Sequence, residues 1–464
     1  MTDQYQNFSH SPLGQFVTKN LGLPQPPKLQ RFERATPVLE GAVLFGAAAN
    51  SIFVAGISQV LANIHANSYA GNNPKLQQLA ARVGLNLGAF NIGDKESKFK
   101  ALIFDASGIA QSQDLQQLYA FFQPLMRQVS ASGRVVVVGL NPQQAKTVAQ
   151  ATAQRALQGF VKSLAKELKK GITAQLLYVD PDAEGNMESS LRFVLSPRSA
   201  YISGQVLYIQ HDAQVQHMDW QQPLLGKTAL VTGASRGIGA AIAQVLARDG
   251  AHVICLDIPA QQQDLQAIAN QIKGSALALD ISQANAGMQI LAAAQSQGGL
   301  DIVVHNAGIT RDKTLANMPQ QAWDVVLDIN LSAIERINHH LLSHQGLNAQ
   351  ARMVCISSIS GIAGNMGQSN YATSKAGVIG LVEYTAPTLA QGMTINAVAP
   401  GFIETQMTAT IPFAIREAGR RMNAMSQAGL PIDVAEAIAF FAQPASGGLN
   451  GNILRVCGQS ILGA

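Results

Sequence analysis

The residues best suited to chemistry lie in one stretch, Ser357 to Lys375. An apolar run, Met353–Ile356, predicts a buried strand, and a glycine-rich loop then leads into a helix that carries Tyr371 and Lys375. These two side chains are one turn apart and therefore share a helix face. A free tyrosine has a pKa of about 10, which a nearby ammonium group lowers. With a strand-end hydroxyl, Ser358, to hydrogen-bond a carbonyl oxygen, the set predicts proton transfer at a carbonyl or an alcohol.

A phosphate-binding loop is predicted upstream, in Thr232-Gly233-Ala234-Ser235-Arg236-Gly237-Ile238-Gly239. It lies between a predicted strand, Thr228–Val231, and a helix that begins near Ile238. In this setting glycines allow the backbone to approach a pyrophosphate closely. The residues expected to contact a cofactor here are Gly233, Ser235, Arg236, Gly237, Ile238 and Gly239.

Two carboxylates end the next two predicted strands. Asp257 is placed to accept hydrogen bonds from an adenosine ribose and to repel a 2′-phosphate, which favours NADH over NADPH. Arg236 is a counter-argument, because its guanidinium could bind that phosphate. Asp280, followed by Ile281, is predicted to bind the adenine amine, with a helix N-cap as the alternative role of Asp280.

Further candidates lie between the loop and the tyrosine helix. The small residues after the fourth strand, Asn306-Ala307-Gly308, let the chain pass against a dinucleotide, whereas His305 is expected to be a packed histidine. Asn330 falls in a helical stretch where asparagine needs a local partner. His339-His340-x-x-x-His344 matches no zinc signature, so no metal site is expected.

The composition, 47% hydrophobic and 13% charged over 464 residues, is typical of an α/β globular protein. A net charge of +4 without a basic or aromatic strip argues against nucleic acid. The three cysteines, each in an apolar run, are interpreted as core thiols in a reducing compartment. Gly41–Ala62 is uncharged over a bilayer's length, but polar residues interrupt it, so a buried strand and helix are expected instead of a membrane span. We expect a cytoplasmic protein.

Strand and helix patterns alternate in two series, which predicts parallel sheets covered on both faces. The series resemble each other: Gln59-Val60-Leu61-Ala62 recurs as Gln244-Val245-Leu246-Ala247, and weaker matches follow in the same order. Two unrelated α/β domains remain the alternative. In the first copy Ala48, Ile52 and Val54 stand at the glycine positions, and Gln150 and Gln154 at the positions of Tyr371 and Lys375. The first copy is therefore predicted to be degenerate.

The predicted fold is two tandem doubly wound, Rossmann-like parallel-sheet domains. The predicted boundaries are an extended N-terminal arm (1–36), a degenerate Rossmann- or flavodoxin-like domain without a cofactor site (37–212), a linker (213–225) and a catalytic dinucleotide-binding domain (226–464).

From Gly226 onward the chain resembles the short-chain dehydrogenase/reductase family. The residues that carry the resemblance are the loop Thr232–Gly239, Asn306-Ala307-Gly308, Asn330, Ser358, Tyr371 and Lys375. Asn306–Asp312 and Asn396–Gly401 look most like 3-oxoacyl-[acyl-carrier-protein] reductases. A degenerate copy ahead of such a domain resembles their long, high-molecular-weight form, which implies NADH, thioesters of acyl-carrier protein or CoA, and a homodimer.

The resemblance implies a role for each residue. Tyr371 is the general acid, Lys375 holds the nicotinamide ribose and lowers the tyrosine pKa, Ser358 polarises the 3-keto oxygen, and Asn330 supports a water that replaces the proton. The loop after the sixth strand would contact the nicotinamide through Pro400, Gly401, Ile403 and Thr405.

One departure from the family concerns the carrier protein, which is acidic. The helix of Tyr371 lacks the late basic residues of ordinary carrier-protein reductases, and Pro387 is expected to kink it. The matching helix of the first copy carries Lys162, Lys166, Lys169 and Lys170. Recognition of the carrier or of CoA phosphates has either moved to this helix or been lost, and a solvated helix face is the alternative interpretation of the lysines.

The segment Phe402–Leu430, with Met407, Pro412, Met422 and Met425, is interpreted as a mobile lid over an acyl chain. Two other functions stay open: a short-chain dehydrogenase acting on another secondary alcohol or ketone, and a dinucleotide-binding regulatory protein. The sequence does not define acyl chain length, the choice between CoA and carrier protein, or the physiological direction.

Overall fold

The computed structural model describes residues 3–34, 36–71, 73–91, 94–214, 218–409 and 411–461, except the side chain of Met407. The chain forms two compact units. Unit 1 comprises Met1–Ala213 and Arg420–Gln427, and unit 2 comprises Gln214–Gly419 and Ala428–Ala464, as far as their residues are described. The predicted boundaries did not anticipate that residues 420–427 fold with unit 1. Of the predicted linker, residues 215–217 lie outside the described part.

Unit 1 contains a seven-stranded parallel sheet with the order β3-β2-β1-β4-β5-β6-β7. Its strands are β1 (Val43–Ala47), β2 (Ser68–Ala70), β3 (Gly88–Ala89), β4 (Phe99–Asp105), β5 (Val129–Leu140), β6 (Thr173–Val179) and β7 (Gln205–Ile209). Its helices are α1 (Gln4–His10), α2 (Pro12–Asn20), α3 (Val54–Asn63), α4 (Pro74–Ala81), α5 (Gln116–Phe122), α6 (Val148–Glu167) and α7 (Glu188–Leu195). The uncharged segment Gly41–Ala62 thus forms β1 and most of α3. Among the described residues, every helix is too short or too polar to span a bilayer.

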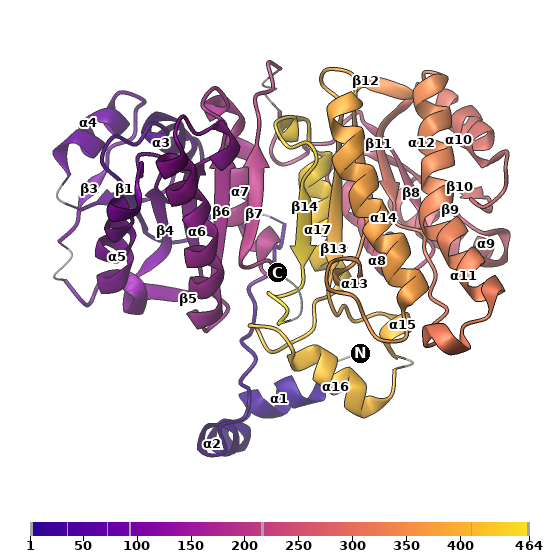
Figure 1. The fold of residues 1–464 in the computed structure, drawn as a ribbon, viewed down its shortest axis with the longest axis horizontal. Coiled ribbons are helices and arrows are strands. Elements are labelled where there is room, and N and C mark those ends of the chain that lie inside the picture. The colour runs from indigo at the N-terminus through magenta and orange to yellow at the C-terminus, as the bar shows by residue number, and fades with distance from the viewer. Residues whose placement is uncertain are drawn as a thin grey trace. The chain divides into compact units, whose positions relative to one another are not determined.

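Unit 2 repeats this arrangement, with the order β10-β9-β8-β11-β12-β13-β14 and every strand pair parallel (Figure 1). Its strands are β8 (Thr228–Thr232), β9 (His252–Asp257), β10 (Ser275–Ala278), β11 (Leu300–His305), β12 (Leu347–Ile356), β13 (Thr394–Pro400) and β14 (Ile453–Val456). Its helices are α8 (Gly237–Arg248), α9 (Gln262–Ile272), α10 (Ala286–Gln295), α11 (Gln320–Leu327), α12 (Ala333–Ser343), α13 (Ile359–Ala363), α14 (Ser369–Thr385), α15 (Gln406–Ala409), α17 (Pro431–Ala442) and the larger part of α16 (Phe413–Arg421).

These sheets confirm the predicted tandem doubly wound fold. A feature that the sequence comparison did not use also indicates that the two units are copies of one another. Strands β5 and β12 each carry a buried arginine at the same register. Arg134 pairs with Thr173 across the sheet and donates to the carbonyl of Ser196, and Arg352 pairs with Thr394 and donates to the carbonyl of Pro444. In both cases the accepting carbonyl lies at a short 3₁₀ turn that precedes the last strand of the sheet.

Two predicted elements are wrong. Residues 4–20 are not extended, because Asp3 and Ser11 each accept a backbone hydrogen bond as N-caps and Pro12 starts α2, while the three prolines lie only further on. The tyrosine helix is not kinked at Pro387 but ends at Thr385. A proline has no N–H to donate and disfavours helical geometry at the residue before it, so a short 3₁₀ turn follows.

In each sheet the chain order reverses between two neighbouring strands, β1 and β4 in unit 1, and β8 and β11 in unit 2. Open α/β sheets bind ligands at the carboxyl ends of such strands. In unit 2 this edge carries the glycine loop after β8 and Asn306-Ala307-Gly308 after β11, both singled out from the sequence.

Candidate active site

The glycine loop connects β8 to α8 in a conformation that side chains would obstruct. Gly233 and Gly237 have φ of +68° and +59°, in the left-handed region. A Cβ on Gly239 would lie 1.9 Å from the carbonyl oxygen of Gly233 and 2.6 Å from Nδ2 of Asn306. The loop therefore packs directly on the chain after β11. Helix α8 begins at Gly237 within this loop, and the first N–H groups of a helix have no intrahelical partner.

Thr232 and Asn306 join the two strand ends. The hydroxyl of Thr232 accepts from the backbone N–H groups of Asn306 and Ala307, both at 3.0 Å. The amide of Asn306 donates to the carbonyls of Thr232 and Gly233 at 2.9 and 3.1 Å. Thr232 was quoted in the motif but not predicted as a site residue, because its role depends on contacts with a distant strand.

The loop also contains a buried, unsatisfied hydroxyl. Among the described residues, Oγ of Ser235 has no hydrogen-bond partner although the residue is only 5% exposed. Its backbone N–H donates to Oδ2 of Asp257 at 3.1 Å, and Asp257 accepts a second bond from Ile258 N–H. Arg236 is exposed beside them. The glycine loop Thr232–Gly239, called the glycine cradle below, thus holds an unpaired hydroxyl, which fits a phosphate-bearing group. The residues present therefore suit a dinucleotide.

The other predicted cofactor contacts lie on the same edge. Oδ1 of Asp280 accepts from the backbone and hydroxyl of Ser282, so this carboxylate caps its own turn, and Ile281 beside it is buried. After β13, Gly401 packs so tightly on Cys457 that a Cβ would lie 2.6 Å from it. Ile403 is buried, and the methyl of Thr405 lies 4.0 Å from the Cβ position of Gly237. The loop after β13 thus approaches the glycine cradle.

Ser358, Tyr371 and Lys375 come together at the end of β12. Ser358 caps α13 by accepting from the Ser360 N–H, and its hydroxyl lies close enough to Tyr371 to affect the pKa of the phenol. Nζ of Lys375 lies 5.8 Å from the centre of the Tyr371 ring and donates to the carbonyl of Ile356 at 2.8 Å. The glycine-rich loop needs a glycine at position 361, because a Cβ there would lie 2.7 Å from the backbone of Lys375.

The expected lowering of the tyrosine pKa is wrong for this structure. Burial raises the pKa of Tyr371, while the nearby Ser358 hydroxyl acts to lower it. Burial also lowers the pKa of Lys375 to about 8. The ammonium group donates to the backbone carbonyl of Ile356, and its nitrogen lies 5.8 Å from the centre of the phenol ring. The phenol accordingly holds its proton at neutral pH, as a general acid requires.

Asn330 occupies a single π-helical turn, Asp328–Ser332, between α11 and α12, and such turns are frequent at functional sites. It is fully buried. Its amide bonds both the N–H and the carbonyl of Ile309, at 2.8 and 3.0 Å, and donates to the hydroxyl of Ser374 at 3.1 Å. A Cβ on Gly308 would lie 3.1 Å from Oδ1 of Asn330 and 3.4 Å from Nζ of Lys375. The partner that Asn330 needs within its helical stretch is therefore Ile309, in the loop after β11.

Asn370, next to the tyrosine, was not predicted. It is fully buried, its amide donates to the carbonyls of Arg311 and Ala322, and its Oδ1 accepts from the Tyr371 N–H. It fixes the first turn of α14 to the loop after β11. The available signal was a short polar amide immediately before the tyrosine at a helix start.

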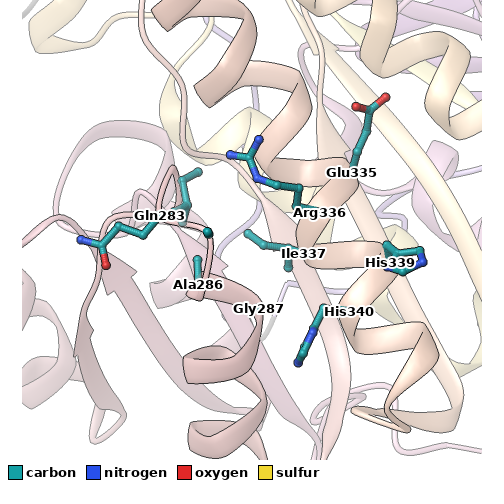
Figure 2. A pocket seen from close by; sticks show the side chains of 10 residues that line it. Gln283, Ala286, Gly287, Glu335, Arg336, Ile337, His339 and His340 are labelled. Carbon is teal, nitrogen blue, oxygen red and sulfur yellow. The ribbon is translucent and has the colours of Figure 1, made fainter.

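His305 and the neighbouring histidines have no place in this set. His305 is buried, hydrogen-bonds Asn338 at 2.7 Å, and burial lowers its pKa to about 4, which confirms a packed histidine. His339 and His340 line a separate hollow of about 420 Å³ between α10 and α12, with Glu335 and Arg336 (Figure 2). The described residues contain no group of three or more His, Cys, Asp or Glu side chains suited to a metal ion.

In unit 1 the corresponding edge is closed by the protein's own side chains. The N–H groups of Ile52, Phe53 and Gly56 donate to Oγ of Ser107, Oδ2 of Asp105 and Oε1 of Glu184, at 2.8, 3.0 and 2.6 Å. Gln154, at the position of Lys375, is fully buried and bonds Leu140 N–H and the carbonyls of Ala106 and Ile109.

Fold and site together are those of a dinucleotide-binding oxidoreductase. Comparisons with known proteins agree. The family model described as enoyl-(acyl carrier protein) reductase matches residues 233–458. The 3-oxoacyl-[acyl-carrier-protein] reductase FabG of Vibrio cholerae is 41% identical over 239 residues, 51% of this chain and 97% of that protein. FabG of Thermotoga maritima is 35% identical over 246 residues, 52% of this chain and 99% of that protein.

A solved short-chain dehydrogenase from Burkholderia cenocepacia J2315 in complex with NADP is 35% identical, with a TM-score of 0.48 over 51% of this chain and 98% of that chain. The curated relatives align along almost their whole length. The chain therefore belongs to the short-chain dehydrogenase/reductase family, and its two tandem sheets agree with the long, two-domain form of the 3-oxoacyl reductases.

Proposed function

We propose that the chain reduces 3-oxoacyl thioesters of acyl-carrier protein or CoA to 3-hydroxyacyl thioesters, with NADH as the reductant. The observation that carries the proposal is the Ser358–Tyr371 pair beside Lys375, at the sheet edge that also holds the glycine cradle. The FabG relatives, named for reduction of 3-oxoacyl-carrier substrates, support the choice of substrate.

In this proposal the protein's side chains transfer one proton to the 3-keto oxygen of the substrate and hydrogen-bond that oxygen. When bound, the reduced nicotinamide supplies the hydride that the carbonyl carbon accepts. The Ser358 hydroxyl donates a hydrogen bond to the 3-keto oxygen, and Tyr371 gives its phenolic proton to that oxygen as charge develops on it. Asn330 supports a water that returns a proton to Tyr371, and Lys375 holds the nicotinamide ribose. The raised pKa of Tyr371 supports a protonated acid before turnover.

The dinucleotide would lie along the cradle, Asp257, Asp280, Ile281, the chain after β11 and the loop after β13. NADH is preferred in this proposal because Asp257 ends β9, where its carboxylate would repel the 2′-phosphate of NADPH. Two backbone N–H groups, of Ser235 and Ile258, hold this carboxylate in place. Exposed Arg236 is the group that would reverse this preference.

Unit 1 is proposed to bind no dinucleotide. The donors that a pyrophosphate would need already bond Asp105, Ser107 and Glu184, and two carboxylates there would repel an anion. A homodimer and a cytoplasmic location are further parts of the proposal, as is a contact for an acidic carrier at Lys162, Lys166, Lys169 and Lys170. The prediction that one helix carries all four lysines is wrong, because α6 ends at Glu167, Leu168 is extended and Lys170 has a positive φ; only Lys162 and Lys166 lie on the helix. Lys166, Lys169 and Lys170 are exposed and Lys162 is half-buried.

The test is reduction of acetoacetyl-CoA and longer 3-oxoacyl thioesters by NADH and by NADPH, with 2-enoyl thioesters and simple secondary alcohols as comparison substrates. Tyr371→Phe is expected to lower kcat by about 10²–10⁴ while dinucleotide affinity stays within about twofold. Oxidation of an unrelated alcohol without thioester reduction would favour another dehydrogenase activity. Dinucleotide binding with no turnover of any substrate would favour a regulatory protein.

A further inference from the structure

The segment predicted as a lid, Phe402–Leu430, is fixed at its far end by the N-terminal helix α1. Residues 420–427 belong by sequence to the reductase half but fold with unit 1, between Gly419 and Ala428 of unit 2. The chain therefore leaves the reductase unit, makes a turn within unit 1 and returns.

The turn is held by a bidentate ion pair. Nη1 and Nη2 of Arg421 each lie 2.7 Å from a carboxylate oxygen of Asp3, and the two side chains are only 15% and 11% exposed. The guanidinium also lies 4.6 Å from the ring centre of Tyr5 and donates to the carbonyl of Ser426. Paired charge-assisted bonds of this geometry, partly removed from water, are stronger than an exposed ion pair.

A second set of contacts holds the end of the turn. The amide of Gln427 donates to the carbonyl of Pro27 at 2.7 Å and accepts from Gln6, and its backbone carbonyl accepts from the hydroxyl of Tyr201 at 2.8 Å. Asn423 closes the turn from within by donating to the carbonyls of Arg420 and Gln427. Helix α1, the proline segment and the body of unit 1 thus all bond these eight residues.

The turn is connected to the proposed active site through the backbone. Two residues after Gln427, Gly429 donates to the carbonyl of Phe402 and accepts from the N–H of Glu404, at 3.0 and 2.9 Å. Ile403, between them, pairs with Gly429 in a parallel bridge. Gly429, two residues along the chain from the anchored turn, therefore pairs with the loop that contains Ile403 and Thr405, two of the predicted nicotinamide contacts.

We propose that α1 and residues 420–427 form a latch that fixes the substrate side of the reductase site, with Asp3 as a positioning residue. The proposal rests on the proposed function, since it takes Phe402–Leu430 to border the acyl thioester. It assigns to the degenerate half a role in substrate affinity that needs no cofactor: a fixed segment keeps the acyl pocket formed before substrate arrives.

The test compares Asp3→Asn with the full-length wild type. Asparagine keeps the helix cap that Asp3 provides to Gln6 N–H but removes the charge paired with Arg421. We expect the KM for a 3-oxoacyl thioester to rise about tenfold, with kcat and dinucleotide Kd within about twofold, since charge-assisted bonds change equilibria by this order. Gln427→Ala, which breaks the second set of contacts, should act in the same direction. Glu33→Gln, an exposed carboxylate of the same N-terminal segment, should change nothing.

Amide hydrogen exchange in residues 413–430 gives a readout that does not depend on activity. Faster exchange together with a raised KM in Asp3→Asn supports the latch. Unchanged exchange, or faster exchange with an unchanged KM, overturns it, because the contact would then be absent or merely structural. A wild type inactive on every 3-oxoacyl thioester would refute the proposed function instead, and exchange would still decide whether Asp3 fixes the segment.

Discussion

The glycine cradle offers the sharpest test of the site, through Gly239→Ala. The Cβ of that alanine would lie 1.9 Å from the carbonyl oxygen of Gly233 and 2.6 Å from Nδ2 of Asn306. The first contact is about 1.5 Å shorter than ordinary van der Waals contact at 3.4 Å. Neither neighbour is a flexible side-chain end, because Gly233 is constrained by its φ of +68° and Asn306 is bonded to two carbonyls. The strand–helix junction must therefore shift.

Overpacking of this kind costs about 1–3 kcal/mol. If the cost falls on the conformation that binds the cofactor, dinucleotide affinity should fall by about 5- to 150-fold. Gly380→Ala is the matched control, because it adds the same methyl group to a helix of the same unit, where the nearest atom is 4.0 Å away. It should keep the affinity and raise Tm by about 2–4 °C, since alanine stabilises a helix interior by about 1 kcal/mol relative to glycine.

The assay is titration of each purified variant with NADH and NADPH by fluorescence, together with thermal unfolding. A Gly239→Ala protein that binds as tightly as the wild type and melts at the same temperature would refute the reasoning. Lower affinity with an unchanged melting temperature would still support the cradle, because the strain would then be confined to the binding conformation.

Three further outcomes follow from burial and charge. Because burial lowers the pKa of Lys375 to about 8, kcat/KM for thioester reduction should fall as pH rises through about 8, and a profile flat to pH 10 would contradict the role of its ammonium form. Burial lowers the pKa of His305 from 6.5 to about 4, so the unfolded chain binds more protons than the folded chain between these pH values. The free energy of unfolding should therefore fall by up to about 3 kcal/mol as pH drops through this window. Urea unfolding should show that His305→Gln removes this loss, whereas His339→Gln, at an exposed position, does not. Reversing the four lysine charges at the end of α6 and in the loop after it should raise the KM for acyl-carrier protein substrates in a salt-dependent way, and an unchanged KM would end the docking hypothesis. The lysines reversed are Lys162, Lys166, Lys169 and Lys170.

Local patterns determined most of what the sequence could show. The alternation of apolar strands and helices, and glycines where only glycine permits close backbone approach, predicted two tandem parallel-sheet domains and the cradle of the second. The spacing of Tyr371 and Lys375 predicted a shared helix face because the helical period is fixed. Even the degeneracy of the first copy was visible in Ile52, Gln150 and Gln154, since side-chain volume and chemistry are properties of residue type.

Contacts between distant residues were decided only by the tertiary structure. The sequence predicted a lowered tyrosine pKa from the proximity of Lys375, but burial raises the pKa of Tyr371 and lowers that of Lys375. Asn370 and Thr232 became visible only when loops from other strands supplied their partners. The pairing of Asp3 with Arg421 spans nearly the whole chain. A local pattern fixes which groups a segment presents, whereas burial and long-range pairing arise only when separate segments are brought together by packing.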